Sequence, residues 1–257
     1  MRVISANVNG IRSAARKGFF TWMSRQRADV VCIQETRAQL DQLGGKVFWP
    51  RGYHGAFHDA QKKGYSGVAI YCRTKPDRII EGLGWPHVDV EGRYLEVQLG
   101  RLSVISLYMH SGSSGEERQQ KKFEMLDQFM PYLRSLRRKR RDYIICGDWN
   151  IAHKPIDLKN WRGNIRNSGF LPEERAWMDE LLGPAGYVDA FRAVDPRPDQ
   201  YTWWSNRGRA WEKNVGWRLD YQIVTPYLGE RVQKARIFRE KRFSDHAPLI
   251  VDYDYQI

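Results

Sequence analysis

A carboxylate and a carboxamide follow one apolar run near the middle of the chain. The run is 143–146, and Asp148 and Asn150 come two and four residues after it. An unbroken run of this length predicts a short strand buried on both faces, which Gly147 ends where a side chain would obstruct. Because alternate residues of an extended chain point the same way, we expect both polar groups to converge beyond the strand. An Asx turn that closes the strand is the structural alternative.

Polar side chains also follow or end several other predicted strands. The full set is Asn7, Glu35, Tyr108, Asp148, Asn150, Asp220, Asp245 and His246. Hard oxygen donors of this kind suit Mg²⁺ or Mn²⁺, and several carboxylates in one pocket repel one another without a cation. Structural alternatives are a turn cap for Asn7 and a half-buried ring for Tyr108. Asp220 could pair instead with Arg218, and His246 could be an ordinary core or surface histidine.

The elements that must position these residues alternate between strands and helices. We expect strands at 2–6, 30–34, 52–57, 65–72, 93–97, 102–107, 143–146, 200–204, 219–224, 232–238 and 248–253, and helices at about 14–27, 116–138 and 172–182. The polar stretch 151–169 is long for a loop, which predicts a functional loop or minor helices. No linker divides the chain, so we expect one α/β domain over 1–257, with two sheets packed face to face and helices outside.

Composition limits the partners and the compartment. The chain has 257 residues, a formal charge of +12 and 13% aromatic residues, which together favour a nucleic acid as partner. No stretch approaches the roughly 20 apolar residues of a membrane span. The first residues run straight into a strand pattern without a signal sequence, so we expect a cytoplasmic protein. Cys32, Cys72 and Cys146 lie within apolar runs and are predicted to be reduced core thiols.

Five consecutive basic residues, Arg137–Arg141, end the predicted helix 116–138. Cations at a helix C-terminus complement the helix dipole. The run enters the strand 143–146 at its start, whereas Asp148 leaves at its end, about 17 Å away at roughly 3.3 Å per residue. We therefore expect the basic run on the face opposite the chemistry, as a solvated face or a secondary site for RNA or another partner.

Five motifs together resemble one known family. They are Asn7-Val8-Asn9-Gly10, Gln34-Glu35-Thr36, Gly147-Asp148-Trp149-Asn150, Trp217-Arg218-Leu219-Asp220-Tyr221 and Ser244-Asp245-His246-Ala247-Pro248. In this order they resemble the exonuclease III-type apurinic/apyrimidinic (AP) endonucleases, which have a four-layer α/β sandwich of the DNase I-like type. The resemblance implies a monomeric, magnesium-dependent enzyme of base excision repair. It would hydrolyse the phosphodiester 5′ to abasic sites in duplex DNA, and 3′→5′ exonuclease or 3′-end-cleaning activity stays open.

The same resemblance implies a role for each site residue. The implied metal site comprises Asn7, Glu35, Asp148, Asn150, Asp245 and His246, and the implied pocket for the flipped abasic sugar comprises Trp203, Trp217 and Leu219. Asp148 would orient or deprotonate the attacking water, and Asn150 would fix Asp148 and a phosphate oxygen. His246, held by Asp220, would donate a hydrogen bond to the scissile phosphate, which Tyr108 would also contact. An alternative for the pocket residues is ordinary core packing, with only one of the adjacent tryptophans buried.

Two features depart from that family or point to a rival. His110 stands where many relatives have proline, and the loop 109–115, which contacts DNA in those relatives, lacks a basic side chain in this chain. Val8–Ile11, Arg137–Arg141 and Pro248–Asp254 also resemble the catabolite repression control protein of pseudomonads, a catalytically silent regulator of the same fold that acts in RNA-linked regulation. A phosphatase or sphingomyelinase of this fold is a third reading. The complete set of polar site residues favours the nuclease over the silent regulator. The Trp217–Tyr221 motif and the absence of membrane-binding features argue against the phosphatase or sphingomyelinase.

Overall fold

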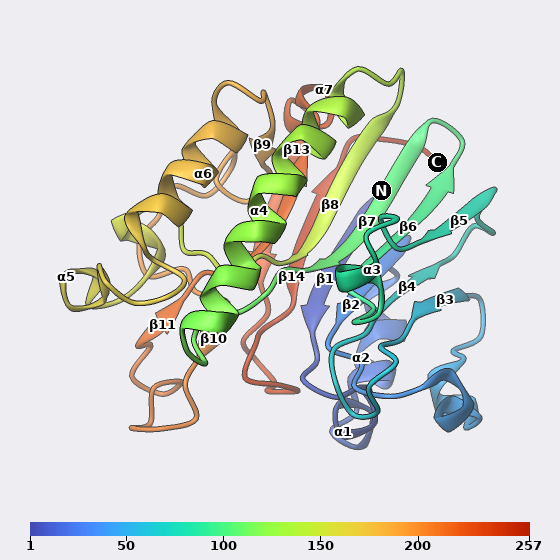
Figure 1. Cartoon of the computed structure of the whole chain (residues 1–257). Coiled ribbons are helices and arrows are strands. Elements are labelled where there is room, and N and C mark those ends of the chain that lie inside the picture. Colours follow the sequence, from blue (N-terminus) through green and yellow to red (C-terminus); the bar gives the residue numbers. More distant parts are fainter.

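The computed structural model describes residues 1–257 as two six-stranded sheets packed face to face between outer helices (Figure 1). The first sheet has, in order, β13 (Val232–Ile237), β14 (Leu249–Tyr253), β1 (Arg2–Asn7), β2 (Val30–Gln34), β4 (Val68–Cys72) and β3 (His54–His58). The second has β5 (Arg78–Glu81), β6 (Tyr94–Leu99), β7 (Leu102–Tyr108), β8 (Asp142–Asp148), β12 (Asp220–Val224) and β9 (Val188–Asp189). Parallel pairs, β1 with β2 and β7 with β8, lie at the centre of each sheet. The predicted four-layer α/β sandwich is confirmed.

Side-chain alternation divides each central strand between two cores. Val3 and Cys32 of the first sheet pack between the sheets against Ile144 of the second. Their neighbours in sequence point the other way, so Ile4 packs against helices on one outer face and Ile145 on the other. Strands buried on both faces are apolar without alternation, which is why these runs read as continuous in the sequence.

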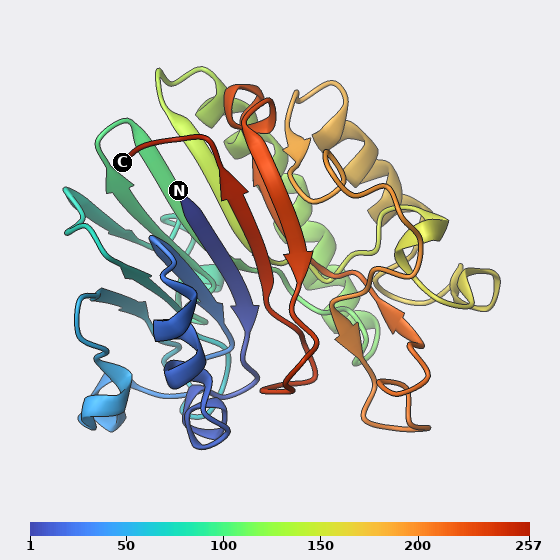
Figure 2. The ribbon, with the colours of Figure 1, turned by 180° about the vertical axis from the view of Figure 1, so that it is seen from behind.

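Helices cover both outer faces. They are α1 (Ile11–Arg16), α2 (Phe19–Gln26), α3 (Pro86–Asp89), α4 (Glu116–Arg137), α5 (Trp161–Asn164), α6 (Pro172–Leu182) and α7 (Pro226–Gly229), with short 3-10 turns at Leu40–Leu43, Lys46–Phe48 and Pro155–Asp157. α4 and α6 lie side by side on the second sheet (Figure 1), and α1 and α2 cover the first (Figure 2). The single helix predicted at 14–27 is wrong, because Gly18 has a φ of +84° and separates α1 from α2.

Three short strands have no signal in the sequence. β5 and β9 sit at the two edges of the second sheet, and β11 (Gly216–Trp217) pairs with β10 (Trp203–Trp204) in a separate two-stranded ribbon. Such short strands are defined by partners that are distant in the chain, so local periodicity does not reveal them. The stretch 151–169 contains a 3-10 turn and α5, in agreement with the expected minor helices.

The end of β8 differs from its prediction in two ways. Gly147 lies inside the strand, which continues to Asp148. Asn150 has a φ of +52° and is not extended, so strand alternation does not explain why its side chain and that of Asp148 share a cavity. A tight turn does. The obstruction at Gly147 is real, because a Cβ there would lie 2.0 Å from the carbonyl oxygen of Leu107.

We expect Gly147→Ala to destabilise the protein by about 3 kcal/mol, the upper range for overpacking a rigid site. The added methyl group would meet the carbonyl oxygen and carbon of Leu107 on β7. These are backbone atoms of a central strand and cannot move aside as the end of a flexible side chain could. Gly163→Ala is the matched control, because nothing lies within 4 Å of its added methyl group and it is helical, so it should be neutral or slightly stabilising. Urea unfolding of both variants tests this, and equal midpoints would contradict it.

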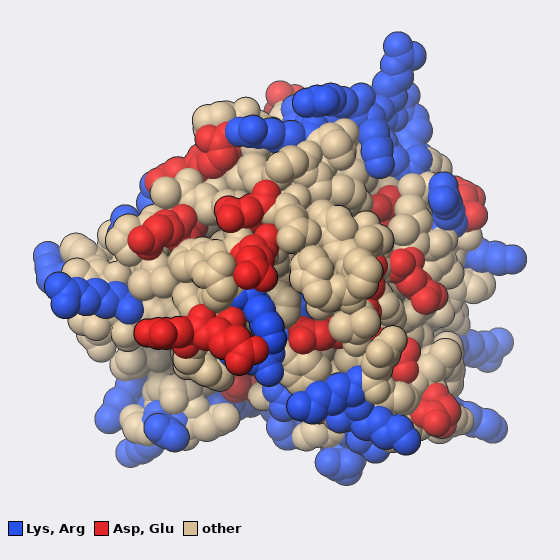
Figure 3. Space-filling view, viewed as in Figure 1, with Lys and Arg blue, Asp and Glu red and all other residues tan.

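The basic run Arg137–Arg141 lies at the far end of β8 from Asp148. The turn that carries it joins α4 to the first residue of β8, at the top of Figure 1, and Lys and Arg side chains gather at the same edge in Figure 3. Arg141 is held by hydrogen bonds from its Nε to Ser103 and from its Nη2 to the Leu102 carbonyl. The run contributes no side chain to the main cavity, as its position in the sequence predicts.

The three cysteines, Cys32, Cys72 and Cys146, are buried and form no disulfide, as predicted. No helix in the structure combines the length and the hydropathy that crossing a membrane requires.

Candidate active site

A cavity of about 1010 Å³ opens where β1, β2, β7 and β8 end. The predicted site residues that line it are Glu35, Tyr108, Asp148, Asn150, Trp203, Trp217, Leu219, Asp245 and His246. The remaining two, Asn7 and Asp220, are each 1% exposed and lie behind the lining. Chain segments more than 200 residues apart therefore meet at one end of the sandwich.

Asn7 holds two carboxylates that come from different sheets. Its Nδ2 donates to Oε1 of Glu35 at 2.8 Å and to Oδ2 of Asp148 at 2.9 Å. Its Oδ1 accepts the backbone N–H of Asn9 at 3.0 Å. The side chain of Asn7 thus supports the site from behind and does not face the cavity.

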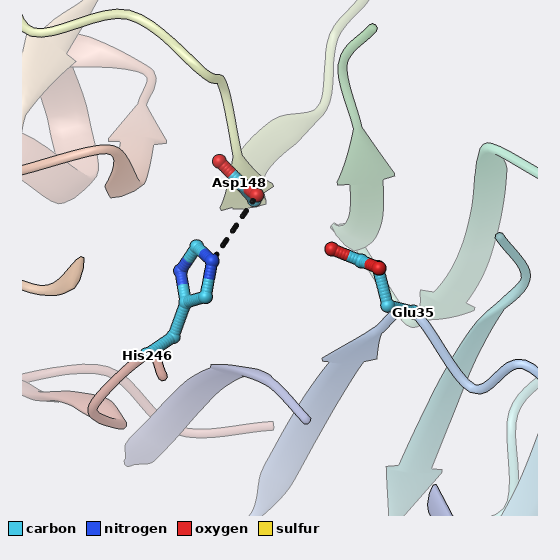
Figure 4. A group of neighbouring side chains, drawn as sticks. All are labelled: Glu35, Asp148 and His246. Atoms are coloured by element: carbon cyan, nitrogen blue, oxygen red, sulfur yellow. Dashed lines mark ion pairs between the residues drawn. The ribbon is translucent and has the colours of Figure 1, made fainter. Parts of the chain in front are cut away.

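His246 lies between two aspartates. Its Nδ1 is 2.8 Å from Oδ2 of Asp220, and its Nε2 faces Oδ2 of Asp148 at 3.7 Å (Figure 4). Burial disfavours the charged imidazole, but the carboxylates of Asp220 and Asp148 outweigh it and raise the pKa of His246 to about 10. The ring is therefore charged at neutral pH, and both nitrogens carry hydrogens.

Asp148 is the most perturbed carboxyl group of the site. Burial raises its pKa to about 7, repulsion from Asp220 and Glu35 adds to the rise, and His246 opposes it. The N–H of Asn150 donates to Oδ1 of Asp148 at 2.9 Å, so the Asx turn weighed as an alternative is present and forms part of the site. The Nδ2 of Asn150 donates to the Met109 carbonyl at 2.9 Å, and Asn150 lines the cavity.

Tyr108 is half-buried and backed by a buried arginine. The guanidinium of Arg93 lies 4.6 Å from the centre of the Tyr108 ring and donates through Nη1 to the Tyr108 carbonyl at 3.1 Å. Burial, together with the charge of Glu35, raises the pKa of Tyr108 well above its usual range. The phenol therefore stays protonated and can donate a hydrogen bond into the cavity.

Asp245 stands on the cavity wall with its oxygens engaged. Asn9 Nδ2 donates to Oδ1 at 2.8 Å, and Trp203 Nε1 donates to Oδ2 at 3.2 Å. Burial opposes the charged form, but His246, Asn9 and the other donors lower the pKa of Asp245. A permanent negative charge results at this edge of the cavity.

The donor set fits a hard divalent cation. An oxygen of Glu35 and one of Asp148 lie within 4.8 Å of each other and of a His246 nitrogen, and Asp245 adds a further carboxylate to the cavity lining. Arg37 contributes the cation that faces Glu35, through a 2.8 Å hydrogen bond from its Nε to Oε2. Carboxylates at such separations repel one another, and a divalent cation would add to the positive charges of Arg37 and His246 that offset this repulsion.

The apolar wall is formed by Trp203, Trp217 and Leu219. Trp203 and Trp217 are paired across the β10–β11 ribbon, and both line the cavity. Trp204 points the other way and is fully buried, as alternation along the strand predicts.

Sequence reasoning missed several supporting residues. Asn9, Arg37 and Arg93 hold Asp245, Glu35 and Tyr108, respectively. Asn9 and Arg37 each lie two residues from a predicted site residue, a spacing that is enough to suggest them, whereas Arg93 has no such signal.

The proposed structural pairing of Asp220 with Arg218 is wrong. Arg218 binds Asp157 at 2.8 Å and Asp189 at 2.7 Å, which leaves Asp220 to His246.

The proteins that this chain resembles in sequence and in structure include nucleases. The sequence pattern of the Endonuclease/Exonuclease/phosphatase family matches residues 4–246. The chain is 38% identical to an exodeoxyribonuclease of Bacillus subtilis, covering 97% of this chain and 98% of that protein. It is 36% identical to the DNA repair nuclease APEX1 of Danio rerio, over 97% and 81% of the two chains. The structure of an AP endonuclease from Archaeoglobus fulgidus superposes with a TM-score of 0.90 at 29% identity, over 99% and 100% of the chains.

Proposed function

Because the chain belongs to the Endonuclease/Exonuclease/phosphatase family, we propose that it is a magnesium-dependent AP endonuclease of DNA repair. Its substrate would be duplex DNA with an abasic site, cut at the phosphodiester 5′ to the lesion, and Mn²⁺ would be the alternative ion. The observation that carries this proposal is the meeting of Glu35, Asp148 and His246 beside a cavity with an aromatic wall.

Glu35 and Asp245 would hold the cation, with Asn7 fixing Glu35 from behind. When bound, the cation would neutralise charge on the phosphate. Asp148 has a pKa near neutrality, so it can orient a water molecule and accept its proton at physiological pH. Asn150, on the turn that follows, would hold Asp148 through its N–H.

His246 is better suited to phosphate than to the metal. Its Nδ1 is held by Asp220, and its pKa of about 10 gives the ring a positive charge that suits an anionic partner. We therefore assign it as a hydrogen-bond donor to a non-bridging phosphate oxygen, with Asp220 fixing its orientation through Nδ1. The protonated Tyr108 would donate to the same phosphate.

Trp203, Trp217 and Leu219 would enclose the flipped abasic sugar. A sugar without its base is extruded at little energetic cost and fits an apolar wall, whereas an attached base would collide with it. This wall supports a preference for abasic sites over intact nucleotides.

A nicking assay on a duplex with one tetrahydrofuran abasic analogue tests the function. With Mg²⁺ we expect a single cut 5′ to the analogue, no cut with EDTA, and recovery when excess Mg²⁺ or Mn²⁺ is added. An intact duplex is the control substrate. Failure to cut under all metal conditions would contradict the proposal and favour the silent regulator of the same fold.

Replacement of Arg137–Arg141 by alanine should leave the nicking rate within about tenfold, a ceiling of roughly 1.4 kcal/mol in transition-state energy. The run lies at the opposite end of β8 from Asp148 and lines no part of the cavity. The measurement is the nicking rate at two salt concentrations, because a loss that disappears at low salt reports only general attraction to DNA. A loss above tenfold at both would show that the run engages the substrate.

We also propose that residues 1–257 act as one domain and as a monomer in the cytoplasm, without membrane contact. Three buried free thiols support a reducing compartment. A 3′→5′ exonuclease or 3′-end-cleaning activity remains part of the proposal, since one relative is an exodeoxyribonuclease.

A further inference from the structure

An ion pair with no solvent exposure lies behind the catalytic turn. Lys122 of α4 and Glu174 of α6 are both 0% exposed, and Lys122 Nζ lies 2.5 Å from Glu174 Oε1. The same Nζ donates to the backbone carbonyl of Asn150 at 2.8 Å. Neither residue lines the cavity or has a role in the reaction described above.

Both carboxylate oxygens of Glu174 accept further hydrogen bonds. Its Oε2 accepts the N–H of Leu171 at the start of α6, at 3.0 Å, and Gln119 Nε2 donates to Oε1 at 3.1 Å. The pair therefore joins α4, the beginning of α6 and the turn after β8. These two helices lie side by side over the second sheet in Figure 1.

A buried ion pair is weak evidence for stability, because desolvation offsets most of the attraction, so its presence calls for another explanation. The contact with Asn150 provides one. Asn150 adopts a φ of +52°, a left-handed conformation that asparagine tolerates better than most residues, and hydrogen bonds from three sides fix the turn there. Its carbonyl points inward to Lys122, its N–H binds Asp148, and its side chain lines the cavity.

We propose that Lys122 is a positioning residue that fixes the Asn150 turn, and through it the carboxylate of Asp148, with Glu174 fixing Lys122. The inference rests on the proposed nuclease function. Removal of the lysine leaves the Asn150 carbonyl without its donor, so the turn relaxes and the catalytic groups lose their alignment. Small displacements of this kind reduce turnover and leave substrate affinity largely intact.

The experiment separates positioning from stability by comparing a single with a double variant. Lys122→Met leaves the buried carboxylate of Glu174 without its cation and should lower both Tm and kcat. Lys122→Met with Glu174→Gln removes both charges. The new amide oxygen keeps the bond to the N–H of Leu171, and the Oε1 of Gln119, which has no partner, can accept from the new amide nitrogen. The double variant should therefore regain most of the lost Tm.

We expect kcat for nicking to fall at least tenfold in both variants, with KM changed less than threefold. Lys121→Met is the matched control, because Lys121 is exposed, pairs with Glu117 one turn away, and should leave kcat unchanged. If kcat recovers along with Tm in the double variant, the role is structural and the inference is overturned. Wild-type kcat in Lys122→Met overturns it as well.

Hydrogen exchange keeps this test independent of the function. Backbone amides of residues 149–152 should exchange faster in both variants than in wild type or in Lys121→Met. If the wild-type protein fails to nick abasic DNA but this local change occurs, the proposed function fails and the positioning role stands. Unchanged exchange in an active enzyme would reject the positioning role alone.

Discussion

Asp148→Asn is expected to reduce the nicking rate by about 10³-fold, within the range for removing a general base or its equivalent in water orientation. The carboxyl group is 1% exposed, accepts from Asn7 and Asn150, and has a pKa raised to about 7. Asparagine preserves the size of the side chain but cannot accept a proton. It also removes one negative charge beside the phosphate, so DNA affinity should be retained or increased.

Single-turnover nicking at saturating enzyme, together with a separate binding titration in EDTA, measures the two effects of this substitution independently. Asp127→Asn is the charge-matched control, because Asp127 is exposed on α4 and lines no cavity. Equal turnover by wild type and Asp148→Asn would remove Asp148 from the reaction. A rate loss explained by a proportional loss of binding would reassign it to substrate affinity.

The second large effect is expected for the His246–Asp220 pair. His246→Gln should lower the nicking rate by about 10²- to 10³-fold, the range for removing one preorganised donor to developing charge. Asp220→Asn should cost nearly as much, since the 2.8 Å contact to Nδ1 holds the ring and its charge. Because the two residues act as one unit, the double variant should be little worse than His246→Gln. Rate losses that multiply would show that Asp220 acts separately.

The pH dependence of the rate tests the same pair. The pKa of His246 is raised to about 10, so its charged form, and the donor it supplies, is complete at neutral pH and is lost as pH rises toward 10. Asp220→Asn removes the carboxylate that contributes most to this rise in pKa, so the loss should begin at lower pH. Rate profiles between pH 6 and 10 would show this shift, and superimposable alkaline limbs would contradict the assignment.

The layers of the fold and most residues of the site can be predicted from the amino-acid sequence alone. Continuous apolar runs such as Val30–Gln34 specify strands buried on both faces, because each residue needs an apolar neighbour whichever way it points. The helix predicted at 116–138 from its amphipathic repeat agrees with α4, Glu116–Arg137, to within one residue at each end. Polar groups at the ends of such strands are unusual, and most of those predicted to meet do line one cavity.

Which of these groups face the cavity and which stand behind it depends on how the chain folds. In the sequence, Asn7 and Asp220 follow the same strand-end pattern as Glu35. In the structure both are buried and serve as supports, Asn7 to Glu35 and Asp220 to His246. The turn at Asn150, and the buried Lys122 that binds its carbonyl, depend on contacts between helices and a strand far apart in the chain. Sequence periodicity reports whether a residue is buried, but hydrogen-bond partners are chosen by the packing of elements that only the folded chain brings together.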